Sequence, residues 1–596
     1  MLDLILRGGH VIDGTGRPRF RADVGIRNGR IAAIGTIDEP AREVLDIEGQ
    51  VVTPGFIDVH THLDAQLLWD PYATPSCLHG FTTIIAGNCG FGITPLVDSS
   101  RSYIQGMLSR VEGMQLSAIE QGPAWDWSST RDYLDRLEGK LGINAGFLIG
   151  HSTLRRAVMG EDATRGHADP KQVEQMVDLY RDCLSEGGLG LSTSWAHTHN
   201  DHAGSKVPSR YASDDEIMAL CAATQEFPGT FIEAGGQPPY VDDAQIQRFA
   251  KMSAVANRPL NLGVIVFTDD SHDDALPNLA IADHARKIGG ATFAQTIVTG
   301  SNYWLSFGTG FIFDGIPGWE HAMTCPREER LAILRDPAKR EALRKAAADY
   351  DQHDAYLART NIAKWPEMRI VSTVAPENRK YDGQLVGDIA AAEGKAPFDA
   401  LMDIVCADDL GTVVLPRPSG YAEDTWKERI KTMRDPRAIV AGSDAGAHLD
   451  FLAQFNQTST LIEYAVRKHQ LVTLEEVVHH VTDRVARLFG LRGRGRVETS
   501  WQADLIVMDP ERIASGPVHM RADLPAGASR TYAEAEGISH VFVNGQAIVS
   551  KGKTTGALPG QVLRSGRDTD TVTAQSLLTP AESTQATQGT QATQTT

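Results

Sequence analysis

The most informative stretch of this chain is Pro54-Gly55-Phe56-Ile57-Asp58-Val59-His60-Thr61-His62. Its apolar residues predict a short buried strand after the Pro54-Gly55 break. Side chains two residues apart on a strand point to the same face, so His60 and His62 converge on one point. Two buried imidazoles without partners would each cost about 1 to 3 kcal/mol. The pattern therefore suits a metal site, and a chance pair in a surface loop is an equal alternative at this point.

Length and composition narrow the class of protein. The chain has 596 residues, of which 42% are hydrophobic and 22% are charged, which is ordinary for a globular protein. Its net charge of −19 argues against a nucleic acid partner. No apolar run approaches the ~20 residues of a membrane span, and the start carries no signal-peptide pattern. The six cysteines show no CxxC spacing, which argues against a disulfide framework. We expect a cytoplasmic protein without a membrane partner.

Both ends of the chain are rich in predicted strands. Short β segments occupy residues 2–52, and Asn28-Gly29 is a signal for a type I′ hairpin. Similar segments return at 503–509 and 540–549. We expect residues 1–54 and 489–565 to form one small β-sandwich from the two ends of the chain.

The middle of the chain, residues 55–488, alternates predicted strands with predicted helices. Helices are expected at 214–225, at 337–350 with Asp336 as N-cap, and at 474–489. Such alternation predicts the α/β class, and the length suits a TIM-type (β/α)8 barrel with insertions. Residues 566–596 end in a Thr- and Gln-rich run, which predicts a disordered tail.

A late apolar segment at 438–440 leads into Gly442-Ser443-Asp444. In a closed parallel barrel the first and last strands are neighbours, and active sites lie at the carboxyl-terminal face. Asp444 is therefore predicted to lie beside His60 and His62, unless it caps the following helix. His448, four residues later, is a candidate for substrate contact or for a hydrogen bond behind a ligand.

Further polar residues follow other predicted strands. His151 ends the segment 147–150, where a neutral imidazole can polarise a carbonyl or simply form a hydrogen bond at the rim. Arg155 can bind a substrate carboxylate, although solvation is the ordinary fate of an arginine. His197, His199 and His202 share a predicted loop that suits a second metal, a lid or solvent.

The early His-x-His block and the late Gly442-Ser443-Asp444 block resemble the amidohydrolase superfamily, as does a β module built from both termini. Further blocks are similar to the N-acyl-D-amino-acid deacylases. These are Thr74-Pro75-Ser76, His79-Gly80-Phe81-Thr82-Thr83, Gly87-Asn88-Cys89-Gly90, Gly150-His151-Ser152-Thr153-Leu154-Arg155, Val158-Met159-Gly160 and Gly190-Leu191-Ser192-Thr193-Ser194. The resemblance covers nearly everything except the tail.

The resemblance implies a zinc hydrolase with His60 and His62 as ligands. It places Asp444 beside the activated water as ligand and general base, and Cys89 at the position of a zinc-binding cysteine. A thiolate suits Zn²⁺ better than Mg²⁺ or Ca²⁺, whereas a small buried apolar role is the alternative for Cys89.

Two departures from the deacylase pattern concern later strands. The resemblance leads us to expect histidine ligands within 230–235 and 259–264, and neither segment contains one. We therefore expect one Zn²⁺ ion, and a second remains open. Glu233 is a candidate for contact with substrate or metal, or for a buried pair.

The predicted function is hydrolysis of a non-peptide C–N bond in a small N-acyl amino acid or related amide. The partner is then a small-molecule amide, and a homo-oligomer is left open. The same machinery hydrolyses lactones, cyclic imides and carbamates, and a catalytically silent scaffold is the alternative from another class.

Overall fold

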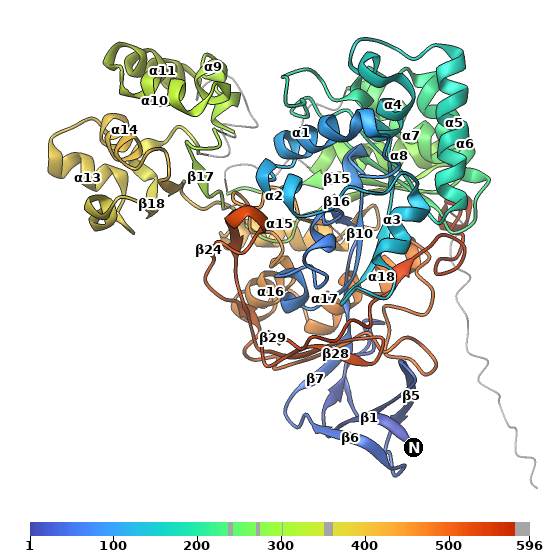
Figure 1. Cartoon of the computed structure of the whole chain (residues 1–596). Helices are drawn as coiled ribbons and strands as arrows, with labels where there is room; N and C mark the ends of the chain where they lie inside the picture. The colour runs from blue at the N-terminus through green and yellow to red at the C-terminus, as the bar shows by residue number, and fades with distance from the viewer. Residues whose placement is uncertain are drawn as a thin grey trace, which may run out of the picture.

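The structure of this chain is a computed structural model, and its described residues are 1–236, 242–269, 275–300, 302–310, 312–350, 361–440 and 442–578. It contains both parallel and antiparallel sheets together with many helices, so the predicted α/β class is confirmed (Figure 1). Among these residues, none of the helices is both long and apolar enough to cross a membrane.

Strands from the two ends of the chain share one sheet. In this sheet β7 (Val51–Pro54) pairs with β22 (Leu505–Met508), which also pairs with β27 (Ile538–Val543). The sheet is completed by β2 (His10–Val11), β3 (Phe20–Arg21), β28 (Gln546–Ser550) and β29 (Lys553–Thr554). Figure 1 shows these amino- and carboxyl-terminal strands side by side at the base of the molecule.

A second sheet comes from the amino-terminal segment alone. Its order is β5 (Arg30–Gly35), β4 (Asp23–Arg27), β1 (Leu2–Arg7) and β6 (Ala41–Asp46). Leu6 and Val24 of this sheet belong to one buried cluster with Val52 and Leu505 of the first sheet. The predicted Asn28-Gly29 hairpin is present, with φ of 50° and 75°, because both turn residues must adopt positive φ.

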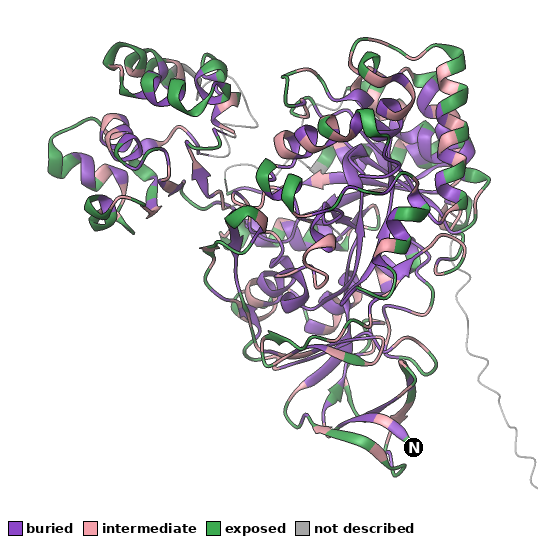
Figure 2. Ribbon diagram, in the orientation of Figure 1, coloured by how far each residue is buried: buried purple, intermediate pink, exposed green. Residues whose placement is uncertain are grey.

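The parallel strands form three groups, and the third joins an early strand to a late one. β8 (Phe56–Asp58), β10 (Phe81–Ala86) and β11 (Asn144–Phe147) are paired in that order. The second group is β12 (Ile149–Gly150), β13 (Gly190–Ser194), β14 (Phe231–Gly235), β15 (Pro259–Ile265), β16 (Ala291–Thr296) and β20 (Ala438–Ile439). In the third, β9 (His60–Thr61) pairs with β21 (Gly442–Ala445). Buried residues concentrate along these strands (Figure 2).

Helices connect the parallel strands or follow the last of the series, β21. These are α1 (Arg101–Val111), α2 (Leu116–Gln121), α3 (Thr130–Leu137), α4 (His151–Met159), α5 (Pro170–Ser185), α6 (Asp214–Gln225), α7 (Asp243–Ala256), α8 (Ala275–Lys287), α15 (Glu423–Arg434) and α16 (Gln457–Leu461). The first turn of α5 shows why a helix begins at this point of the sequence. The Asp169 side chain accepts from the Gln172 N–H, the Gln172 side chain accepts in return from the Asp169 N–H, and Pro170 fits the first turn.

The predicted helices agree with the structure except at one point. The helix expected at 214–225 is α6, and the one at 337–350 is α11 (Pro337–Tyr350). The single helix expected at 474–489 is instead α17 (Leu474–Val481) and α18 (Asp483–Leu488). Thr482 separates them with φ −134° and ψ −91°, which no continuous helix allows.

An insertion between β16 and β20 has its own core. It contains α9 (Glu320–Thr324), α10 (Arg327–Arg335), α11, α13 (Val386–Glu393) and α14 (Pro397–Ala407), with a small sheet of β17 (Leu305–Ser306), β18 (Arg369–Ser372) and β19 (Val413–Leu415). Stacked rings of Trp319 and Trp365, 5.7 Å apart, lie at its centre. Figure 1 shows this insertion to one side of the parallel strands.

Residues 566–578, which were expected to belong to a disordered tail, pack against the fold instead. Within 566–578 the Asp570 N–H donates to the Gly490 carbonyl, the Thr569 hydroxyl to the Gly229 carbonyl, and α19 (Ala574–Leu578) follows. Just before it, β30 (Val562–Leu563) extends the parallel group by pairing with β11. These backbone partners are distant in sequence, so composition does not reveal them. The low-complexity run itself lies outside the described residues.

Candidate metal centre

Four side chains from separate parts of the chain meet where β9 pairs with β21. His60 Nε2 lies 3.5 Å from Cys89 Sγ and 3.7 Å from Asp444 Oδ1. His62 Nε2 lies 3.1 Å from the same Asp444 oxygen. Both histidines are buried, whereas the Asp444 side chain is 28% exposed. The structure therefore brings together His60, His62, Cys89 and Asp444, and leaves one side of the cluster open.

The backbone presents these side chains through unusual conformations. Cys89 has φ 54°, Asp444 φ 55° and His448 φ 50°, all in the left-handed region that non-glycine residues seldom adopt. Each such residue costs of order 1 to 3 kcal/mol, and such residues cluster at functional sites. Asp58 links β9 to β21, because its Oδ1 accepts hydrogen bonds from the backbone N–H groups of His60 and Ser443.

The donor set fits a zinc ion. Two imidazoles, one thiol and one carboxylate are the ligands that Zn²⁺ takes in proteins. Burial raises the pKa of the Cys89 thiol, and the nearby carboxylates raise it further, so a thiolate there needs a cation. His60 Nδ1 and Glu233 Oε1 are buried without a hydrogen-bond partner. Such orphaned groups are costly in a plain core.

Glu112 is a residue of this cluster that the sequence analysis missed. It follows α1, its side chain is 4% exposed, and its Oε1 lies 3.4 Å from His62 Nδ1. The available signal was helical spacing, since Ile104, Leu108 and Glu112 lie four residues apart and the first two are buried. An acidic residue on the apolar face of a helix requires a partner.

Burial and mutual contact shift the pKa values of the charged groups in the cluster. Burial raises the pKa of Glu112 and of Glu233 to about 8. Burial alone would lower the pKa of His62, but Glu112 and Asp444 raise it to about 9. Burial opposes the charge on Asp444 too, yet the hydrogen bond and charge of His62 hold the pKa of Asp444 well below its usual range. Burial lowers the pKa of His60 to about 4.

Comparison with known proteins identifies the family of this chain. A model of the amidohydrolase family matches residues 43–549, which is most of the chain. The chain belongs to the amidohydrolase family. The resemblance seen in the motifs and the predicted hydrolase class are thereby confirmed.

The relatives of this amidohydrolase include a D-aminoacylase and an N-acyl-D-glutamate deacylase. It is 26% identical to D-aminoacylase from Alcaligenes xylosoxydans xylosoxydans over 571 residues, covering 94% of this chain and 97% of that protein. It is 28% identical to N-acyl-D-glutamate deacylase from the same organism over 572 residues, covering 94% and 96%.

Solved structures share its fold. A D-aminoacylase structure superposes with a TM-score of 0.64 at 23% identity, covering 95% of this chain and all of that one. N-acyl-D-glutamate deacylase from Bordetella bronchiseptica, complexed with zinc and a phosphonate inhibitor, gives 0.62 at 24% identity with the same coverage.

In this amidohydrolase, each of the two segments where the resemblance led us to expect a histidine contains a glycine beside the cluster. Gly235 of β14 and Gly263 of β15 are paired in register. A Cβ at Gly235 would lie 3.5 Å from Cys89 Sγ, and one at Gly263 would lie 3.3 Å from His60 Cε1. Both positions therefore face the cluster, and neither supplies a ligand.

Glu233, a sequence-predicted candidate, lies within the cluster. Its Oε2 accepts from the Cys89 N–H at 2.8 Å, and its Oε1 is 3.7 Å from His60 Nδ1. The side chain is fully buried. Glu233 therefore contacts two candidate ligands, Cys89 and His60.

His151 and Arg155 lie in a different cluster. His151 Nδ1 is 2.9 Å from the Thr193 hydroxyl, and its Nε2 is 2.8 Å from Glu216 Oε1. Arg155 Nη1 donates to Glu216 at 2.7 Å, and Nη2 donates to the Gly166 carbonyl. His151, Arg155 and Glu216 are fully buried. None of these contacts joins His151 or Arg155 to the His60 cluster.

The remaining histidine candidates differ in burial and in their contacts. The His448 N–H donates to the Glu112 carbonyl, and a Cβ at Gly113 would lie 3.0 Å from His448 Nδ1, so His448 borders the cluster. His199 Nδ1 is 2.8 Å from the Ser194 hydroxyl. His197 and His202 are exposed.

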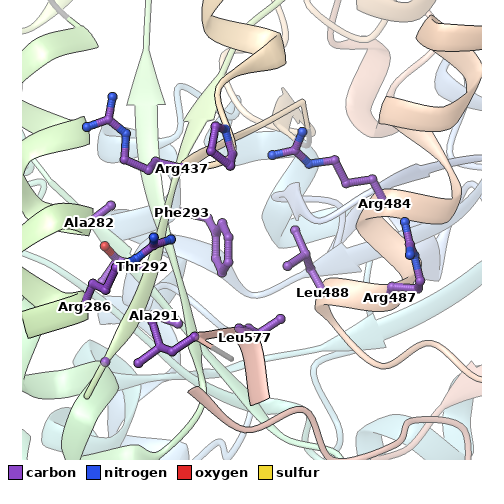
Figure 3. Close-up of a pocket in the computed structure, with 13 residues that line it drawn as sticks. Ala282, Arg286, Ala291, Thr292, Phe293, Arg437, Arg484, Arg487, Leu488 and Leu577 are labelled. Carbon is purple, nitrogen blue, oxygen red and sulfur yellow. The ribbon is translucent and has the colours of Figure 1, made fainter. Parts of the chain in front are cut away.

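A separate pocket lies at the amino-terminal ends of β16 and β20 (Figure 3). Ala291 and Phe293 line it together with Arg437, Arg484 and Leu577. Asp444 instead follows the carboxyl-terminal end of β20 and lines a small pocket with Leu63 and Phe455. Because the metal cluster lies at the carboxyl-terminal strand ends, the pocket of Figure 3 is not the candidate site.

Proposed function

We propose that this amidohydrolase hydrolyses a non-peptide C–N bond in a small N-acyl amino acid or related amide, with one zinc ion held by His60, His62, Cys89 and Asp444. The observation that carries the proposal is the convergence of His60 Nε2, His62 Nε2, Cys89 Sγ and Asp444 Oδ1. Chain-long similarity to D-aminoacylase and N-acyl-D-glutamate deacylase supports the substrate class.

The proposal includes a TIM-type (β/α)8 barrel that spans residues 55–488, with a composite β-sandwich of residues 1–54 and 489–565. The parallel pairings from β8 to β20, and the pairing of β21 with β9, support closure of the barrel. Such closure explains why side chains near the first and last strands meet at one face.

The proposed chemistry assigns the proton transfers to Asp444. A bound zinc ion would lower the pKa of a water from about 15.7 toward about 7 and would polarise the scissile carbonyl. Asp444 is partly exposed and ionised, so it can accept the proton of the attacking water. Protonated Asp444 then donates to the leaving nitrogen. Cys89 and the two histidines hold the site in place.

The proposal gives the other candidates smaller roles. His448 borders the cluster and stays a candidate for substrate contact. Both ring nitrogens of His151 already have partners. The proposed mechanism therefore does not use His151, and its role in polarising the scissile carbonyl stays a prediction. Gly235 and Gly263 bring no ligand to the cluster, which supports one ion rather than two.

The decisive experiment replaces Asp444 with Asn. Losing a positioned proton acceptor should lower kcat by about 10³-fold or more, because general base catalysis alone contributes about 10²- to 10⁴-fold. The substrates are N-acyl D- and L-amino acids, with lactones and cyclic imides as the competing classes. Zinc content should stay near one ion per chain.

The matched control is Asp178→Asn, on an exposed part of α5, which should leave kcat unchanged. Full activity of Asp444→Asn would contradict the assignment. A wild-type chain that holds no zinc and hydrolyses none of these substrates would favour the silent scaffold.

A further inference from the structure

A buried glutamate lies behind each of the two histidines of the metal cluster. Glu112 Oε1 is 3.4 Å from His62 Nδ1, and Glu233 Oε1 is 3.7 Å from His60 Nδ1. The two glutamates come from different elements, since Glu112 follows α1 and Glu233 belongs to β14. Their side chains are 4% and 0% exposed. Neither carboxylate can rely on water, so each needs a protein partner.

The other nitrogen of each ring faces the centre of the cluster. His60 Nε2 contacts Cys89 Sγ and Asp444 Oδ1, and His62 Nε2 contacts Asp444 Oδ1. The two nitrogens of an imidazole point in divergent directions in the ring plane. An ion bound through Nε2 lies on the side of the ring away from a carboxylate at Nδ1. His62, Glu112 and Asp444 also offer ligand atoms within 4.8 Å of one another, so direct binding by Glu112 is the competing arrangement that the experiment must separate.

Glu233 holds two candidate ligands at once. Its Oε2 accepts from the Cys89 N–H at 2.8 Å, while its Oε1 and His60 Nδ1 are both buried without a hydrogen-bond partner. The distance of 3.7 Å between these two atoms must shorten by only about 0.7 Å to form an ordinary hydrogen bond. A closer approach of the two side chains would satisfy both groups, and Gln295, which also lies within reach of His60, is the competing partner.

We infer that Glu112 and Glu233 are positioning residues, each of which accepts a hydrogen bond from Nδ1–H of one histidine and leaves Nε2 of both rings for the ion. This inference rests on the proposed zinc site. A carboxylate at Nδ1–H selects the neutral tautomer with its lone pair on Nε2, fixes the ring orientation and raises the basicity of the ligand.

The test measures zinc affinity by competition with a chromophoric chelator at fixed pH. The proteins are the wild type, Glu112→Ala, Glu112→Gln, Glu233→Ala and Glu233→Gln, each first checked for a native circular dichroism spectrum. Loss of such an outer carboxylate costs about 10- to 100-fold in metal affinity. Each Ala variant should show that loss, and each Gln variant should fall between it and the wild type because an acceptor oxygen remains.

A second readout separates positioning from plain structural support. In the Co²⁺-substituted protein, the exchangeable Nδ1–H protons of bound histidines give strongly shifted NMR signals. Glu112→Gln should alter the signal of one histidine, and Glu233→Gln that of the other. The control Glu475→Gln, at a half-buried glutamate that pairs with Arg19, should change neither the affinity nor the signals.

Each outcome decides between the possibilities. Zinc affinity within about twofold of the wild type in the folded Ala variants, or unchanged Nδ1–H signals, would overturn the inference alone. Loss of a ligand in the Co²⁺ absorption spectrum of a Gln variant would also overturn it, because the glutamate would then bind the ion directly. A wild-type chain that binds no zinc would overturn the proposed function, and this inference with it.

Discussion

Two buried histidine clusters follow parallel strands in this protein, and they differ in how far their polar atoms are satisfied. In the first, His60 Nδ1 has no hydrogen-bond partner, and Nε2 of His60 and of His62 face Cys89 and Asp444. In the second, both ring nitrogens of His151 have partners, and Arg155 Nε is an atom left without one. Burial and position alone do not distinguish the two clusters, so both are predicted as active-site candidates from the sequence.

The difference shows how a ligand site is recognised in a folded chain. Buried polar groups in a structural network pair with one another, as His151 and Arg155 do with Glu216. A site that awaits an ion instead keeps several donors aimed at one point. This difference supports a structural role for the His151 cluster and the proposed metal site at the His60 cluster.

The largest expected effect is on zinc affinity, when one imidazole is removed from each cluster in turn. His62→Asn should lower zinc affinity by on the order of 10³-fold, because an inward-facing nitrogen donor is lost. His151→Asn should leave the zinc affinity of the folded protein within about threefold of the wild type. Chelator competition measures both. Equal losses in the two variants would abolish the distinction.

The second prediction concerns stability. Glu216→Gln removes the charge that Arg155 meets at 2.7 Å in a fully buried pair. Breaking such a pair should cost about 3 to 5 kcal/mol in the free energy of unfolding, because Arg155 stays buried and uncompensated. Urea unfolding of the zinc-free protein measures this, with the exposed-pair variant Glu226→Gln as control. A loss below about 1 kcal/mol would show that the cluster is not structural.

The third and smallest effect is the pH dependence of zinc binding. Glu112 and Asp444 raise the pKa of His62 to about 9 against its burial, and burial raises the pKa of Cys89. At pH 7 these groups hold protons that must leave before zinc binds, so apparent affinity should rise with pH. The expected slope is at least about tenfold per pH unit between pH 6 and 8.

Calorimetry in buffers of different ionisation enthalpy counts the released protons. Fewer than about one proton at pH 7 would contradict the predicted charge state of the cluster. The variant His151→Asn should release the same number as the wild type, since that ring is outside the zinc site.

Local patterns predicted much of the fold. The Asn28-Gly29 hairpin and the helices at 214–225 and 337–350 lie where the sequence indicated, because turn residues, caps and periodicity act over a few neighbours. The break at Thr482 and the packing of residues 566–578 were not predicted. Both depend on backbone conformation and on partners far along the chain.

The candidate site was likewise predicted from the sequence only in part. His60 and His62 share one face because of strand geometry, which two residues suffice to specify. Glu112, from the end of α1, and the paired glycines Gly235 and Gly263 became part of the site only once the strands and helices were assembled.

The sequence by itself determined the amidohydrolase family, the α/β class and the pair of histidines that face one point. The tertiary structure decided which buried polar residues turn toward that pair and which satisfy each other, as His151 does with Glu216. The physical reason is that short-range periodicity sets the direction of a side chain. Whether a buried nitrogen finds a partner depends on groups that only long-range packing brings within hydrogen-bond distance.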